Sequence, residues 1–216
     1  MWEVINKMTF KEDLQKSLTE LRKSKKRKFD QTVDLIINLQ KFDIKKHPLN
    51  LVLEIPHKIK DKKIGAFLES KNPNIETVSI SEFKKYKDKK VLKKLVKKFD
   101  FFIAQASLMP KVASTFGRVL GPAGKMPSPQ MGIIVNAEEK EIKELKEKIN
   151  QSIKLRVKES SIKLAVGKES MENKKIIENI ITIYNTLIKS LPRDKENIKN
   201  VEIKFTMTKP QKINIR

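Results

Sequence analysis

Hydrophobic positions repeat with two different periods along this chain. Over residues 29–39 apolar side chains fall on one face and polar ones on the other, which is typical of a half-buried strand. A second strand is predicted over residues 51–55. Upstream, leucines at helical spacing follow Thr9 and Glu12, which are spaced as a capping box, so a helix is predicted to begin there.

From residue 64 onward, short apolar runs alternate with stretches at helical spacing. Strands alternating with helices predict a parallel sheet covered by helices, a Rossmann-like arrangement. No Gly-x-Gly-x-x-Gly fingerprint is present, so the arrangement carries no dinucleotide site. The predicted strands are 64–68, 77–80 and 101–104, and helices are predicted after Ser81, over 91–99, after Pro110 and from an Asn136 cap to Ile149.

Strict alternation returns after residue 150. Residues 153–157 and 162–166 predict a hairpin-like pair of strands with one basic face. An amphipathic helix is predicted over 174–191, and a last strand over 201–207. The β-rich flanks therefore bracket an α/β middle, with a linker predicted at 60–63, but periodicity alone does not join the flanks into one body.

A proline-studded loop is predicted over residues 121–129, where Gly permits and Pro fixes particular backbone angles. It is not a phosphate-binding P-loop. That motif needs Gly five residues before the Gly-Lys pair and a hydroxyl after it, whereas Val119 and Met126 occupy those positions.

The net charge of the chain indicates what kind of partner it binds. The 216 residues, enough for one large or two modest domains, carry 48 basic and 26 acidic side chains, a formal net charge of +22. Such an excess favours a polyanionic partner, nucleic acid first, over the alternative of a lysine-rich, heat-adapted surface, because Glu does not rise in step. The run over residues 22–28 suits a helix C-terminus, yet it exceeds what the helix dipole needs and predicts phosphate contact.

Several function classes are excluded. The chain has no cysteine, and its two histidines, His47 and His57, cannot form a metal site alone. No apolar run reaches the ~20 residues of a membrane span, and the N-terminus lacks a signal-peptide core. The protein is therefore predicted to be intracellular, with no membrane partner, no catalytic constellation, no metal and no cofactor.

Two adjoining motifs carry a family resemblance. DFFIAQASLMP over residues 100–110 and RVLGPAGKMP over residues 118–127 resemble the archaeal version of the signature of the universal large-subunit ribosomal protein L one. Further matches span essentially the whole chain, at residues 28–33, 53–57, 166–168 and 206–207.

The resemblance implies a two-domain α/β fold. Residues 1–62 and 154–216 would form a discontinuous α+β RNA-binding domain, with a Rossmann-like α/β domain inserted over 63–153. It also implies a cytoplasmic, ribosome-bound, non-enzymatic protein of the large ribosomal subunit. That protein would bind large-subunit rRNA, form the mobile lateral stalk that assists release of deacylated tRNA from the exit site, and repress translation through its own mRNA.

Carried over residue by residue, the resemblance implies nine RNA-contact positions: Lys28, Phe29, Thr32, Gly167, Lys168, Lys204, Thr206, Met207 and Thr208. The lysines can neutralise phosphates, the threonine hydroxyls can bond ribose and phosphate oxygens, and a glycine permits close backbone approach. Phe29 and Met207 share parity with buried strand residues, so core packing and RNA packing both stay open for them. Thr208 departs from the family, which usually has Gly there.

Two rival functions remain at this point. One is an enzyme that uses the α/β middle as a nucleotide or phosphosugar site, against which the missing Gly-rich phosphate turn argues. The other is a non-ribosomal basic chaperone or a protein of the membrane surface.

Overall fold

A computed structural model describes residues 2–25, 27–44, 46–47, 49–70, 72, 75–129, 131–135, 139–157 and 159–214. The chain divides into two compact units. Unit 1 joins Met1–Ile59 to Gln151–Arg216, and unit 2 is Lys60–Asn150. The mixed α/β class predicted from the sequence is confirmed, with antiparallel pairing in unit 1 and parallel pairing in unit 2.

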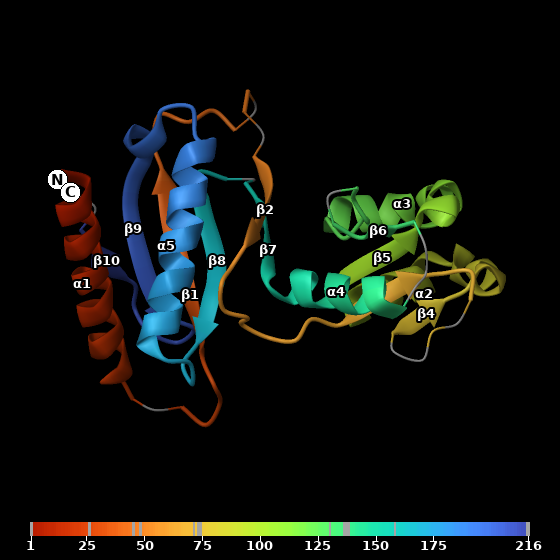
Figure 1. Ribbon diagram of the computed structural model, residues 1–216, viewed down its shortest axis with the longest axis horizontal. Coiled ribbons are helices and arrows are strands. Elements are labelled where there is room, and N and C mark those ends of the chain that lie inside the picture. The colour runs from red at the N-terminus through yellow and green to blue at the C-terminus, as the bar shows by residue number, and fades with distance from the viewer. Residues whose placement is uncertain are drawn as a thin grey trace. The chain divides into compact units, whose positions relative to one another are not determined.

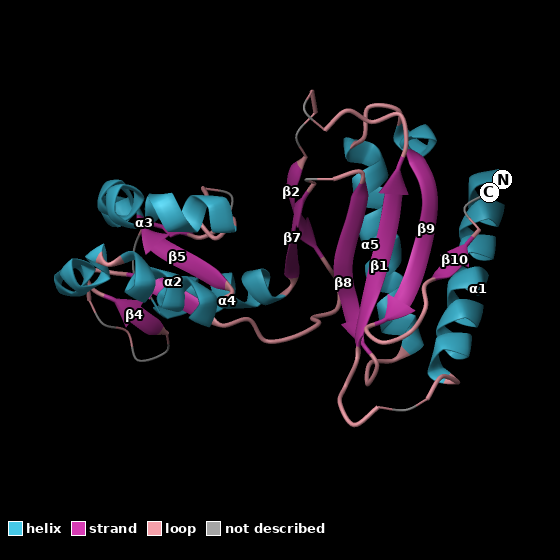
Figure 2. Ribbon diagram, turned by 180° about the vertical axis from the view of Figure 1, so that it is seen from behind, coloured by secondary structure: helices cyan, strands magenta, loops and turns pink. Residues whose placement is uncertain are grey.

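The main sheet of unit 1 is antiparallel and has the strand order β10-β9-β1-β8. Helix α5 (Asn173–Ser190) lies across one face of this sheet, and α1 (Trp2–Arg22) packs beside it (Figure 1). Seen from behind, the strands face the viewer without a helix over them (Figure 2). The strands are β1 (Thr32–Leu39), β8 (Ser161–Lys168), β9 (Ile198–Phe205) and β10 (Gln211–Ile213), and the short helix η3 (Asp194–Asn197) leads into β9.

The predicted alternation of β1 is confirmed, because its odd-numbered residues from Val33 to Leu39 are buried under the helices. Two element starts were wrong. The strand begins at Thr32, so Phe29 lies in the preceding loop, and α1 begins at Trp2, so Thr9 and Glu12 lie inside the helix rather than at its cap. Apolar spacing did not predict the earlier start of the helix because apolar, polar and charged residues are mixed over its first two turns.

The predicted hairpin of residues 153–157 with 162–166 is also wrong. Strand β7 (Ser152–Arg156) pairs instead with β2 (Asn50–Glu54), and β8 pairs with β1. Alternation specifies which residues share a face but not which strand lies alongside. The predicted domain boundary after residue 153 would cut through β7, all of which belongs to unit 1.

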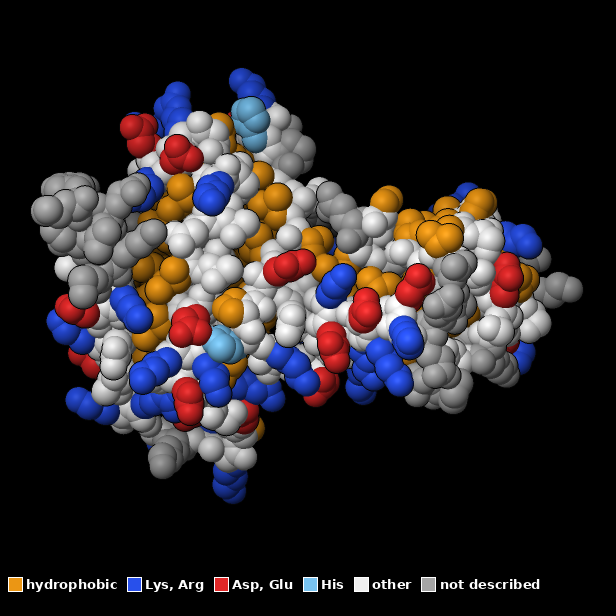
Figure 3. Space-filling view, viewed as in Figure 1, with side chains coloured by type: hydrophobic (Ala, Val, Ile, Leu, Met, Phe, Trp, Pro, Cys, Tyr) orange, Lys and Arg blue, Asp and Glu red, His pale blue; other side chains and the backbone are white. Residues whose placement is uncertain are grey.

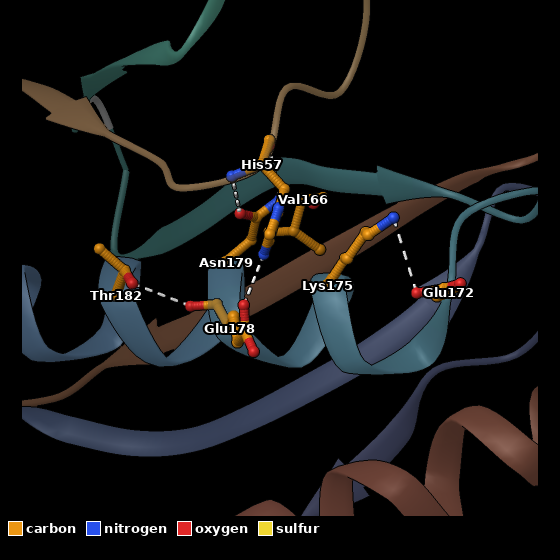
Figure 4. A network of polar contacts seen from close by, with 7 residues as sticks. All are labelled: His57, Val166, Glu172, Lys175, Glu178, Asn179 and Thr182. Carbon is orange, nitrogen blue, oxygen red and sulfur yellow. Dashed lines mark hydrogen bonds and ion pairs between the residues drawn. The ribbon is translucent and has the colours of Figure 1, made fainter.

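A buried asparagine ties the segment after β2 to the main sheet. Asn179 of α5 accepts a hydrogen bond from the His57 backbone N–H (3.0 Å) and donates to the carbonyls of His57 (2.9 Å) and Val166 (3.0 Å) (Figure 4). The His57 ring lies 2.5 Å from the Glu178 carboxylate, and this hydrogen bond is the main cause that lowers the pKa of Glu178. His57 is thus a packing residue of unit 1.

Unit 2 contains a parallel sheet, as the alternating pattern predicted, and its strand order is β4-β3-β5-β6. Helices α3 and α4 lie on opposite sides of β5 (Figures 1 and 2). Four phenylalanines, Phe67, Phe83, Phe102 and Phe116, pack at the centre with ring centroids 4.9–5.9 Å apart. The elements are β3 (Ile64–Phe67), β4 (Glu76–Val78), η1 (Ile80–Lys87), α2 (Lys89–Lys98), β5 (Phe101–Gln105), η2 (Ala106–Leu108), α3 (Met109–Ala123), β6 (Ile133–Ile134) and α4 (Glu139–Asn150).

The proline-studded loop predicted over residues 121–129 begins later than predicted, because residues 121–123 form the last turn of α3. Gly124, at φ 69°, ends the helix in the left-handed conformation that favours glycine. Lys125 then donates to the carbonyls of Val96 (2.8 Å) and Phe99 (2.6 Å), so it anchors the loop to the end of α2. At the other predicted caps, Ser79 rather than Ser81 precedes η1, and Asn136 lies outside the described residues.

Tyr184 of α5 provides a test of packing in unit 1. Its ring stacks on Phe10 at 5.0 Å, its hydroxyl is buried without a partner among the described residues, and burial raises its pKa to about 12. A raised pKa stabilises the fold below the unfolded value near 10, and this stability is lost as the pH rises toward 12.

We expect Tyr184→Phe to unfold at equal or higher urea concentration at about pH 8, because an unpaired buried hydroxyl costs about 1–3 kcal/mol. The variant should also lose less stability than the parent between about pH 9 and pH 11. Tyr86→Phe is the matched control. Equal alkaline losses in the parent and in Tyr184→Phe would show that another group titrates.

Candidate nucleic-acid interface

The nine predicted contact residues come from distant segments that converge at one end of the unit 1 sheet. Strand β1 starts where its antiparallel neighbours β8 and β9 end, at the lower end of the sheet in Figure 1. In register, Thr32 lies opposite Lys168, and Asp34 lies opposite Lys204. We call the region formed by residues 28–32, 167–170 and 204–208 the convergent end.

Gln31 holds the three segments together. Its side chain is buried, donates to the Glu169 carboxylate (3.0 Å) and accepts from the Met207 backbone N–H (3.2 Å). Its own carbonyl accepts from the Glu169 backbone N–H at 2.8 Å. A single side chain therefore fixes the loop before β1 against both the turn after β8 and the turn after β9.

Thr206 extends the sheet beyond the end of β9. Its backbone N–H donates to the Thr32 carbonyl at 3.1 Å. Its Oγ1 accepts from the Thr32 backbone N–H (3.1 Å) and donates to the Thr32 carbonyl (3.3 Å). The hydroxyl proton is thus engaged with the protein, and the exposed hydroxyl oxygen keeps one acceptor position for an outside donor.

Thr208 closes the turn that presents Met207. Its Oγ1 accepts from the Phe205 backbone N–H at 2.9 Å and lies 3.3 Å from the Phe205 carbonyl, to which it donates. Its φ is not positive, since Lys41 and Asp194 are the positive-φ residues other than glycine in the described chain. The backbone therefore does not require a glycine here, and the hydroxyl holds the turn through its hydrogen bonds to the Phe205 backbone.

Two charged residues, one at the start of the basic run and one after it, hold the loop between α1 and β1 in place. Arg22 donates to Asn173 Oδ1 (2.7 Å) and to the carbonyls of Glu169 (2.8 Å) and Met171 (2.5 Å). Arg22 belongs to the run predicted to contact phosphate, but its guanidinium is hydrogen-bonded inside the fold. Lys26 of the same run lies outside the described residues.

Asp30 provides the second brace, because it accepts from the Ser170 backbone N–H (3.0 Å) and hydroxyl (2.9 Å) and lies 3.6 Å from Lys168 Nζ. Burial opposes ionisation, but the Ser170 hydrogen bonds and the Lys168 charge together lower the pKa of Asp30. The carboxylate stays ionised and holds the Lys168 ammonium at the convergent end.

Gly167 is required by packing. A Cβ at this position would lie 2.9 Å from Ile176 Cγ1 and 3.4 Å from Met171 Sδ, both on the helix side of the sheet. Sequence analysis assigned the glycine to close approach of RNA. The side chain of Ile176 explains the missing Cβ without any ligand.

The remaining predicted residues are exposed or half-buried. Phe29 is 52% exposed and Met207 57% exposed, so neither is a core residue, and the choice left open by their parity is resolved. Lys28 is exposed and Lys204 half-buried. Burial raises the pKa of Asp34, against the opposing charge of Lys204 across the strands. Figure 3 shows Lys and Arg side chains gathered around the lower part of unit 1, interspersed with acidic ones.

Other kinds of site are not supported by the described residues. They contain no group of three or more His, Cys, Asp or Glu side chains that could hold a metal ion. No described helix is long and apolar enough to cross a bilayer.

Comparison with known proteins identifies the family of the chain. The profile of the Ribosomal protein L1p/L10e family matches residues 21–209, which include all of the convergent end. The chain belongs to this family. Three relatives are each named large ribosomal subunit protein uL1. That of Nanoarchaeum equitans is 38% identical over 196 residues (86% of this chain, 92% of the relative), that of Pyrobaculum islandicum 33% over 221 (97% and 95%), and that of Pyrococcus horikoshii 34% over 196 (86% and 87%).

Membership of the L1p/L10e family confirms the resemblance drawn from the two signature motifs. It makes the chain a ribosomal protein and, as predicted, not an enzyme. Sequence reasoning missed Gln31, Asp30 and Arg22 as determinants of the site's shape. The first two stood inside the matched motif at residues 28–33, but a polar residue before a strand gives no signal of burial.

The packing of Gly167 gives a prediction with a built-in control. Gly167→Ala should destabilise the protein by about 1–3 kcal/mol, because Ile176 and Met171 must move in a filled core. Gly117→Ala, on α3 where no atom outside the helix's own backbone lies within 4 Å of the new Cβ, should instead stabilise by about 0.5–1 kcal/mol. Urea unfolding measures both. Equal effects of the two substitutions would contradict the packing role of Gly167.

Proposed function

We propose that the chain is an rRNA-binding protein of the large ribosomal subunit and that the convergent end is its RNA-contact site. The observation that carries the proposal is the gathering of the nine residues, from three distant segments, at one end of unit 1 that hydrogen bonds hold in shape. Family membership supports the ribosomal part of the proposal, and the geometry supports the choice of site.

Each exposed group at the convergent end suits a different part of RNA. Lys28, Lys168 and Lys204 supply positive charge to phosphates. The exposed ring of Phe29 and the thioether of Met207 offer flat or adaptable apolar surface to unstacked bases. The free acceptor position of Thr206 suits a ribose 2′-hydroxyl, the group that distinguishes RNA from DNA. Thr32, Gly167 and Thr208 shape the surface through the backbone.

The finer function follows from the family resemblance. Units 1 and 2 would act as two domains, with RNA affinity in unit 1 and movement through the two crossings of the chain, at residues 59–60 and 150–151. On a cytoplasmic ribosome the protein would form the lateral stalk and assist exit-site tRNA to leave. Binding to its own mRNA, through a segment that imitates the rRNA site, would repress its synthesis.

The charge of the site gives the first test. For about five phosphate contacts, a plot of log affinity against log salt should have a slope of about −3.5 to −4.5 on a stalk rRNA fragment. The triple variant Lys28→Gln, Lys168→Gln, Lys204→Gln should make this slope shallower by about 2–3.

The matched control is Lys189→Gln, Lys195→Gln, Lys199→Gln, which removes the same charge from exposed residues at the opposite end of unit 1. This control should keep nearly the parent slope. Equal changes in both triple variants would mean that overall charge, and not the convergent end, binds the RNA.

The proposal that RNA affinity lies in unit 1 gives the second test. Ile59 follows β2 and Gln151 precedes β7, and these two strands are paired, with Glu54 opposite Ser152. A short Gly-Ser linker can therefore join Ile59 to Gln151 in place of unit 2. The shortened chain should fold and bind the rRNA fragment within about tenfold of the full chain, or ~1.4 kcal/mol. A chain that folds by circular dichroism but has lost binding altogether would place essential contacts in unit 2.

A further inference from the structure

The positive charge of unit 2 is concentrated in one segment. Residues 84–98 contain nine lysines and one aspartate, a net charge of +8. The whole of unit 2 has 20 basic and 11 acidic residues, a net charge of +9. Helix α2, in the second half of the segment, has lysine at six of its ten positions and no acidic residue.

The lysines of α2 are displayed on one continuous face. Leu92 and Val96 are buried in the core of unit 2 and fix the orientation of the helix. Opposite them, four exposed lysines follow the i, i+3, i+4, i+7 spacing of a single helical face. We call Lys90, Lys93, Lys94 and Lys97 the lysine face.

Nothing in the described part of the chain neutralises the lysine face. Its four side chains make no ion pair or hydrogen bond there, whereas the neighbouring Lys98 pairs with Glu76 and lies 5.4 Å from the Phe99 ring. Like charges three and four residues apart on a helix repel one another. The arrangement therefore works against the stability of the free helix.

Helix α4 of the same unit shows that general lysine enrichment does not explain this face. Its sequence, EKEIKELKEKIN, carries four lysines and four glutamates, so its charges balance along the surface. Two helices of similar length in one unit thus follow opposite patterns. The chain balances lysine with glutamate on α4 and leaves lysine unbalanced on α2.

We propose that the lysine face is a second RNA-contact surface, which binds the phosphate backbone of duplex RNA without reading its sequence. A nucleic-acid duplex is a dense, regular line of negative charge that rewards several cations on one straight face through release of counterions. The face holds no aromatic side chain on which unpaired bases could stack, and this favours a duplex over a single strand. The contact adds to the site in unit 1 and does not depend on it.

The test uses the full chain in which Lys28→Gln, Lys168→Gln and Lys204→Gln already weaken the first site, with a short RNA duplex of unrelated sequence as the probe. Adding Lys90→Gln, Lys93→Gln, Lys94→Gln and Lys97→Gln should lower affinity by about tenfold or more at low salt and make the salt slope shallower by about 3. The matched control removes the four exposed lysines of α4, with Lys140→Gln, Lys143→Gln, Lys146→Gln and Lys148→Gln, and should change affinity by less than about twofold.

A measurement on the unaltered chain guards against a folding defect. Bound duplex should protect Lys93, Lys94 and Lys97 from acetylation and leave Lys143 and Lys146 reactive. Equal losses of affinity in the α2 and α4 variants, or equal protection of both helices, would overturn the proposal. Protection of the lysine face by poly-L-glutamate as strong as that by RNA would overturn the assignment of RNA as the partner.

Discussion

The central position of β1, antiparallel to both of its neighbours, is the constraint on which unit 1 depends. A middle strand that runs opposite to β8 and β9 must begin where both of them end. The N-terminal and C-terminal parts of the chain are therefore paired in one sheet, and their loops meet at one end of its strands. A register shift between Val33 and Asp34 adds one residue to β8 there, so that Val166 and Gly167 are buried in succession. The second of these has no side chain, and Ile176 occupies the space.

This constraint explains what could be predicted from the sequence. The faces of β1, α5 and the parallel strands follow from local periodicity, because burial repeats with the period of each element. The partner of β7 does not, because residues 50–54 are about a hundred positions away and leave no mark on the local pattern. Phe29 and Met207 matched the parity of buried residues, yet both lie beyond the ends of their strands, where parity has no meaning. The site residues came from the family resemblance, and Gln31 was missed because its burial depends on Glu169 and Met207.

The polar groups of the convergent end serve the fold before any ligand arrives. Asp30, Gln31, Thr206 and Thr208 make hydrogen bonds to neighbouring backbone and side chains, and Arg22 does the same from the end of α1. Exposed groups such as Lys28, Phe29 and Met207 are thereby carried on turns that already have a defined shape. A site arranged in advance loses less conformational entropy on binding, so more of the contact energy remains as affinity.

The same distinction separates two kinds of positive charge in this chain. Arg22 and Lys125 donate to backbone carbonyls, so their charges belong to the folded protein itself. The lysine face of α2 has no such partner among the described residues, although α4 shows that the chain can balance lysine with glutamate. Self-repulsion of this kind destabilises a compact state, and a polyanion that binds the folded form offsets it through linkage. The net charge of +22 is therefore best understood as a property of an assembly with RNA, of which this chain is the positive part.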